Sequence, residues 1–173
     1  MSVMTHLKRT LVQLILYQSS EAHNMPTVTY PHAISSNVTK TMRGNKATDS
    51  KPELTLRRAL WKHGIRGYRL HCKDLPGKPD LCFRAKQTIV FVHGCFWHSC
   101  PACKISKPRH NAPYWSTKLE GNVARDEKHV QRLGEMGWQV VVVWECQIKK
   151  DLAACITLIE SSLKQASTKA PKS

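Results

Sequence analysis

The 173-residue sequence is poor in acidic residues and has no long hydrophobic run. Asp and Glu number 12 against 27 Lys and Arg, which gives a formal net charge of +15 and a pI near 9.8. This excess favours a polyanionic partner, nucleic acid first and an anionic membrane surface second. No apolar run approaches the roughly 20 residues of a membrane-spanning helix, so we expect no integral membrane protein. Apolar residues still make up 41% of the chain, which excludes disorder throughout.

The cysteines are odd in number and unevenly spaced, unlike those of a disulfide framework. Of seven cysteines, Cys95, Cys100 and Cys103 lie together, and Cys146 follows an apolar run. A full set of disulfides would leave one thiol over, and no clean secretory signal is present, which together indicate a reducing compartment. The C-x4-C-x2-C pattern plus one distant cysteine supplies the four thiolates of a structural zinc site. A set of buried free thiols is the alternative.

The composition changes along the chain. The segment 19–41 is rich in Ser, Thr, Asn and Pro. We therefore expect a flexible or non-core extension over residues 1–40, one folded domain over 41–166 and a basic disordered tail over 167–173.

The hydrophobic pattern predicts an α/β sandwich with a mixed sheet. Ser50 and Glu53 form a capping-box pattern that starts a helix ending at Gly64. Further elements are expected as strands at Tyr68–His71, Asp80–Phe83, Thr88–Val92 and Trp138–Trp144, and as helices from Trp115 or Ser116 to Met136 and at Leu152–Leu163. Because the last strand is apolar on both faces, we predict that it is central in the sheet.

One carboxylate has a setting suited to a divalent cation. Asp80 follows the rigid turn Leu75–Pro79, and the next strand ends at Val92 and His93. Carboxylate and carbonyl oxygens hold Mg²⁺, and an imidazole can move a proton near neutral pH. The alternative is that Asp80 only caps the turn.

A series of motifs resembles the bacterial very-short-patch repair endonucleases. The motifs are LPGKPD at 75–80, FVHGCFWH at 91–98, YW at 114–115, NVARD at 122–126 and GWQVVVVWEC at 137–146. They occur in order and at compatible spacing between about residues 42 and 150, and HGCFWH and VWEC are rare strings. The resemblance implies a restriction-endonuclease-like three-layer fold with a structural zinc site. It also implies a Mg²⁺-dependent nick on the 5′ side of the thymine in a T·G mismatch, which arises when 5-methylcytosine deaminates.

The resemblance also implies residue roles. Asp80 and the backbone oxygen of Val92 would hold Mg²⁺, and Glu53 would support the site. His93 would assist at the scissile phosphate, and His98 would serve as general base or proton carrier. The structural Zn²⁺ would be bound by Cys95, Cys100, Cys103 and Cys146. Phe96, Trp97 and Trp115 would form a wedge in the DNA stack, and Met42, Arg43 and Lys78 would contact DNA. Arg125 and Asp126 are interpreted either as a pair supporting the site or as a surface salt bridge.

The implied partner is double-stranded DNA with a T·G mismatch, for a monomer in the bacterial cytoplasm. Mismatch-repair proteins are further candidate partners. Two alternatives stay open: a restriction-type endonuclease of other specificity, and a catalytically silent zinc-stabilised DNA-binding module. Val92 favours the last, because the family often has Thr at this position.

Overall fold

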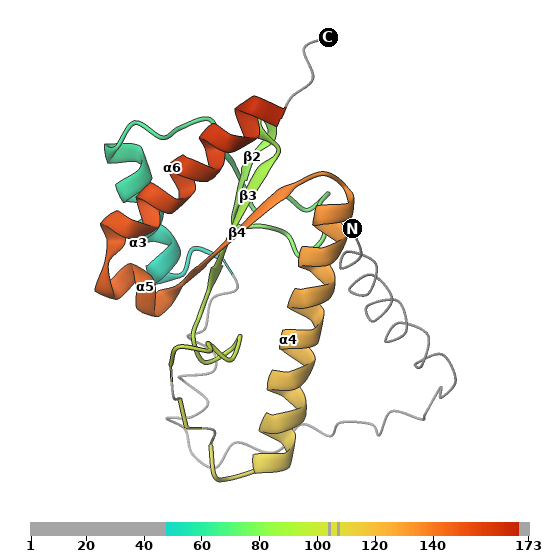
Figure 1. The fold of residues 1–173 in the computed structure, drawn as a ribbon. Helices are drawn as coiled ribbons and strands as arrows, with labels where there is room; N and C mark the ends of the chain where they lie inside the picture. Colours follow the sequence, from blue (N-terminus) through green and yellow to red (C-terminus); the bar gives the residue numbers. More distant parts are fainter. Residues whose placement is uncertain (1–47, 104, 107, 170–173) are drawn as a thin grey trace, which may run out of the picture. The chain divides into compact units, whose positions relative to one another are not determined.

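The computed structural model describes residues 48–103, 105–106 and 108–169, all within one compact unit of the chain (Figure 1). The extension expected over residues 1–40 and the predicted DNA contacts Met42 and Arg43 lie outside these residues. Within the described ranges, every helix is too short or too polar to cross a membrane.

The elements follow the predicted order, with two short helices added. They are α3 (Lys51–Lys62), β1 (Arg69–Leu70), β2 (Leu81–Phe83), η1 (Arg84–Lys86), β3 (Thr88–His93), α4 (Ala112–Glu135), β4 (Gln139–Trp144), α5 (Glu145–Lys150) and α6 (Leu152–Lys169). The 3₁₀ helix η1 between β2 and β3 and the helix α5 directly after β4 were not predicted. Helix α6 continues beyond the predicted end at Leu163, so residues 167–169 of the expected tail are helical.

The four strands form one mixed sheet in the order β1-β2-β3-β4. The pairs β1–β2 and β2–β3 are antiparallel, whereas β3 and β4 are parallel. The prediction that the valine-rich strand is central is wrong, because β4 ends the order among the described strands. Its two apolar faces have another cause: helices cover the sheet on both sides.

Alternate residues of β3 and β4 face two separate cores. Val90 and Val143 pack in a core with residues of α3, α5 and α6, whereas Ile89 and Phe91 pack in a second core with Leu133 of α4. Figure 1 shows the same arrangement, with α3, α5 and α6 on one side of the sheet and α4 on the other. Since side chains of a strand alternate between faces, one register fixes both cores. The α/β class is confirmed.

The start of α3 differs from the predicted capping box. The hydroxyl of Ser50 accepts a hydrogen bond from the Glu53 backbone N–H at 3.4 Å, as predicted. The Glu53 carboxylate, however, points to Arg57 and His71, with Oε1 at 3.2 Å and 3.3 Å from their nitrogens. The cap is therefore one-sided, and the buried Glu53 side chain, only 2% exposed, is available for another role.

Candidate active site and cysteine cluster

A cavity of about 390 Å³ opens where β3 ends, between the turn before β2 and helix α4. Its lining includes the predicted site residues Lys78, Asp80, Val92, His93 and His98, together with Thr48, His71, Lys73, Gly77, Phe91, Asp126, His129 and Val130. The turn requires a glycine at position 77, because φ is +74° and a Cβ there would lie 3.1 Å from Phe91 and His129. The tight turn brings Asp80 beside the end of β3.

Asp80 is a mostly buried carboxylate held from one side. Its Oδ2 accepts a hydrogen bond from the backbone N–H of Val92 at 2.7 Å. Burial raises the pKa of Asp80 to about 6, and the nearby Glu53 adds to the rise, whereas the Val92 hydrogen bond and the neighbouring histidines oppose it. A cation bound at this carboxylate would offset the cost of its buried charge. Asp80 therefore fits a Mg²⁺ site that uses few protein ligands and retains several waters.

Two histidines and a second aspartate also line the cavity. The rings of His93 and His98 stack at 4.0 Å between centroids, and His98 Nδ1 lies 2.5 Å from Asp126 Oδ2. When Nδ1 carries the proton shared with Asp126, Nε2 is left as the basic nitrogen of His98. Burial and the neighbouring His98 lower the pKa of His93 to about 4, so His93 is neutral at pH 7.

A third group surrounds Glu53, which does not itself line the cavity. Arg57 Nη1 lies 2.5 Å from Asp49 Oδ1 and 3.2 Å from Glu53 Oε1. The His71 ring lies between Glu53 and Asp80, with Nδ1 at 4.0 Å from Asp80 Oδ1. Glu53 is thus connected to the cavity through His71.

Sequence reasoning did not find His71 and His129, and it left the role of Asp126 open. Asp126 lines the cavity and pairs with His98 across 28 positions of sequence, which agrees with the interpretation that it supports the site, although its partner there is His98. Arg125 instead donates a hydrogen bond to Asn122 Oδ1 at 3.1 Å. A periodicity signal existed: Asp126 and His129 are three residues apart, which places them on one face of α4.

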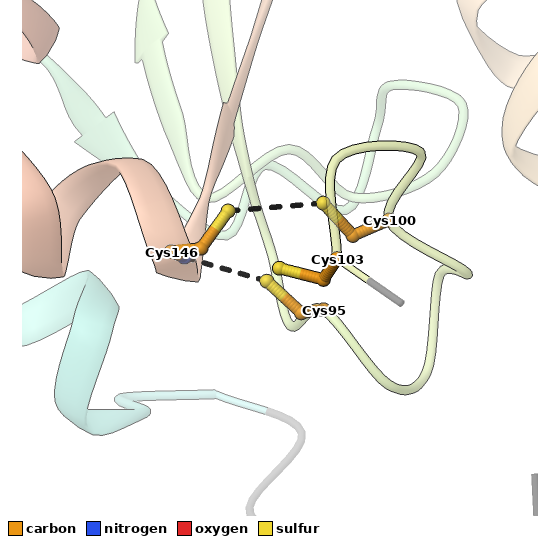
Figure 2. A group of neighbouring side chains, drawn as sticks. All are labelled: Cys95, Cys100, Cys103 and Cys146. Atoms are coloured by element: carbon orange, nitrogen blue, oxygen red, sulfur yellow. Dashed lines mark hydrogen bonds between the residues drawn. The ribbon is translucent and has the colours of Figure 1, made fainter. Parts of the chain in front are cut away.

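The four predicted cysteines lie together in space. The loop after β3 carries Cys95, Cys100 and Cys103, and Cys146 faces them from the start of α5 (Figure 2). The four sulfur atoms all lie within 4.8 Å of one another, and those of Cys100 and Cys146 are 3.7 Å apart. The cysteines are free thiols, and the cluster could hold a metal ion.

The geometry of this cluster fits zinc. Four sulfurs at about 2.3 Å from a tetrahedral Zn²⁺ lie about 3.8 Å apart. The backbone N–H of Cys146 donates to Cys95 Sγ at 3.3 Å, an interaction that stabilises a thiolate. Without metal, burial raises the pKa of Cys95 to about 12, so this thiol is protonated at neutral pH and metal binding would release its proton.

The predicted wedge residues form one half-buried aromatic cluster beside the cavity. Phe96 lies 5.1 Å from Trp97 and 5.6 Å from Trp115 between ring centroids, and the two tryptophans are 6.1 Å apart. Asn122 of α4 donates a hydrogen bond to the Trp97 backbone oxygen at 3.0 Å. The loop that carries His98 and three of the cysteines therefore also carries Phe96 and Trp97, which pack against Trp115 of α4.

Known proteins resemble most of the domain. A family model described as DNA mismatch endonuclease Vsr matches residues 34–104. The type II nicking enzyme V.XorIIP of Xanthomonas oryzae pv. oryzae is 43% identical over 114 residues, which are 65% of this chain and 82% of that protein. V.NaeI of Lentzea aerocolonigenes, also a type II nicking enzyme, is 39% identical over 132 residues, covering 74% of this chain and 79% of the relative.

A third relative carries the family's own name. The DNA mismatch endonuclease Vsr of Escherichia coli (strain K12) is 34% identical over 110 residues, covering 64% of this chain and 70% of that protein. These matches confirm the resemblance that the motifs indicated. The chain therefore belongs to the Vsr family and is a DNA endonuclease.

Proposed function

We propose that this endonuclease makes a Mg²⁺-dependent nick on the 5′ side of the thymine of a T·G mismatch left by deaminated 5-methylcytosine. The observation that carries the proposal is that Asp80, His93 and the His98–Asp126 pair line one cavity. One carboxylate for a cation and one oriented imidazole for a proton are the groups that phosphodiester hydrolysis requires. The names of the family model and of the Escherichia coli relative support the mismatch as substrate.

In the proposed mechanism, each residue of the cavity has a distinct task. Asp80, with the backbone oxygen of Val92, would hold Mg²⁺, which supplies charge stabilisation at the phosphate when bound. His98 Nε2 accepts the proton of the attacking water, while Asp126 holds the ring in the required tautomer and stabilises the imidazolium. His93, neutral at pH 7, contacts the phosphate as a hydrogen-bond donor.

We assign the cysteine cluster to structural Zn²⁺. A four-thiolate site is closed and carries no open position for catalysis. It would join the loop after β3 to α5, and that loop carries His98 and two rings of the aromatic cluster, Phe96 and Trp97. We further propose that the domain adopts the restriction-endonuclease-like three-layer fold, which the helices on both faces of the mixed sheet support.

The aromatic cluster of Phe96, Trp97 and Trp115 is proposed to insert into the DNA stack beside the mismatch. Base–aromatic stacking contributes about 1–3 kcal/mol per base. A mismatched step is less costly to open than a matched one, so the wedge would itself favour the T·G site. Lys78, exposed at the cavity rim, would contact a phosphate, and the net charge of +15 would support DNA binding in the bacterial cytoplasm.

A nicking assay on labelled duplexes tests the substrate. One duplex carries a T·G pair within a cytosine-methylase site, and its control carries C·G at the same position. The proposal predicts a single Mg²⁺-dependent nick on the thymine strand of the first duplex only. Cleavage of both strands of the matched duplex would instead establish a restriction-type enzyme, and intact binding without any cleavage would leave the silent zinc-stabilised module.

A further inference from the structure

His71 has a constrained place at the edge of the candidate active site. It follows β1 with φ at +47°, in the left-handed region, where histidine is one of the few residue types found with any frequency. Its backbone N–H donates to the backbone oxygen of Asp80 at 3.3 Å. The main chain at His71 is therefore tied to the main chain of the carboxylate residue.

The imidazole of His71 lies between two carboxylates. Nδ1 is 4.0 Å from Asp80 Oδ1, and Nε2 is 3.3 Å from Glu53 Oε1. Nε2 is a buried nitrogen without a properly oriented hydrogen bond, the one such side-chain nitrogen or oxygen in the part of the chain that the structure describes. Glu53 Oε1, 3.3 Å from Nε2, is the carboxylate oxygen closest to this end of the ring, and Asp49 Oδ1 follows at 3.8 Å.

Arg57 explains why this group is unsuited to a second cation. Its Nη1 already lies between the carboxylates of Asp49 and Glu53, at 2.5 Å and 3.2 Å. A metal ion there would have to displace the guanidinium. Arg57 therefore fixes Glu53, and Glu53 in turn faces the His71 ring.

Asp80 needs a second orienting contact to keep a fixed direction. Val92 holds only Oδ2, through one hydrogen bond of 2.7 Å. Oδ1 is the oxygen that faces His71. Groups that orient metal ligands from behind typically change metal affinity by about 10–100-fold when they are removed.

We propose that His71 is a positioning residue that orients the metal-binding carboxylate of Asp80 through Nδ1, while Glu53, fixed by Arg57, lies against Nε2 at the other end of the ring. This inference rests on the proposed assignment of Asp80 to the divalent cation. It gives Glu53 a role through His71 rather than by direct contact with the reacting groups.

Three substitutions of His71 test the contributions of its two ring nitrogens separately. His71→Asn keeps a polar group near the position of Nδ1, His71→Gln keeps one near Nε2, and His71→Leu keeps neither. Asn also tolerates the left-handed backbone at this position.

Mn²⁺, a paramagnetic substitute for Mg²⁺, is titrated into the full chain with its cysteine cluster metal-loaded, and the concentration of free Mn²⁺ is measured by electron paramagnetic resonance. Asp80→Asn identifies the binding that belongs to this site, and thermal unfolding of each variant is recorded in parallel.

The proposal predicts that His71→Leu and His71→Gln bind Mn²⁺ about 10–100-fold more weakly, whereas His71→Asn stays close to the parent. Unchanged affinity in His71→Leu, with binding still lost in Asp80→Asn, would overturn the role of His71 alone. Equal losses in all three His71 variants, in step with lowered melting temperatures, would show a purely structural residue and overturn it too. Mn²⁺ binding that survives Asp80→Asn would overturn the metal assignment of the proposed function as well.

Discussion

At the scale of single residues, Asp80 illustrates the cost of an ionised group held ready for a cation. The side chain is mostly buried, and burial without a metal disfavours its charged form, which raises its pKa to about 6. The hydrogen bond from the Val92 N–H stabilises the charged form only in part. A candidate metal ligand with a perturbed pKa in a cavity is a common feature of functional sites.

In Mg²⁺-free solution, Asp80 should destabilise the folded protein above pH 6. The folded-state pKa of about 6 exceeds the unfolded value of about 3.9, so the stability contributed by the protonated carboxyl is complete below about pH 4 and lost as pH rises through 6. Asp80→Asn stays neutral and should exceed the parent in free energy of unfolding by about 1–3 kcal/mol at pH 7.5. This difference in free energy of unfolding between Asp80→Asn and the parent should become smaller toward pH 5.5. Urea unfolding of both proteins at both pH values measures the difference. A difference that does not change with pH would show that the pKa of Asp80 is not raised by folding.

At the scale of elements, the loop after β3 combines three features of the candidate site. It carries His98, the rings of Phe96 and Trp97, and most of the cysteine cluster. Three long-range connections restrain it: Asn122 of α4 binds the Trp97 backbone, Asp126 of α4 pairs with His98, and Cys146 of α5 faces the other cysteines. Loss of any of these connections should therefore affect recognition and chemistry together.

Purified parent protein should contain about one zinc per chain, and Cys146→Ser should lose it. Cys155→Ser is the control, because Cys155 is also a free thiol, more buried than Cys146, but lies outside the cluster, in α6. Metal analysis by mass spectrometry gives the content. Well-folded parent protein without zinc would refute the assignment.

Trp97→Ala should weaken binding to a T·G duplex more than binding to a matched duplex. Loss of about 1–3 kcal/mol of stacking corresponds to roughly 5–150-fold in affinity. Trp61→Ala is the control, because Trp61 is an exposed tryptophan of α3, 58% accessible, outside the aromatic cluster. Fluorescence anisotropy with both duplexes provides the affinities. Equal losses on the two duplexes would argue against insertion.

The elements and the cysteine cluster were largely predictable, because their signals are local in sequence or carried by the motifs. Other features depend on distant partners. His98 meets Asp126 across 28 positions, and the Glu53 carboxylate turns from the predicted capping role to Arg57 and His71. The position of β4 was mispredicted for a similar reason: apolar residues on both faces reveal covering helices, not neighbouring strands.

At the scale of the whole molecule, the net charge and the fold contribute different things: the charge favours DNA binding, and the fold forms the cavity. The net charge of +15 supplies affinity for DNA without sequence information. The mixed sheet places the end of β3 between the turn before β2 and α4, and this arrangement forms the cavity. Cleavage and general DNA affinity should therefore be separable by substitutions within the cavity.

The most direct test of catalysis in this cavity is the rate constant of nicking under single-turnover conditions, with enzyme in excess over a T·G duplex and Mg²⁺ present. We expect Asp80→Asn to abolish the nick and His98→Gln to slow it by about 10²–10⁴-fold, both with DNA affinity close to that of the parent. His129→Gln, a change at a cavity residue with no assigned catalytic role, is the control and should nick at a near-parental rate. Full-rate nicking by Asp80→Asn or His98→Gln would show that the phosphodiester bond is cleaved somewhere other than this cavity.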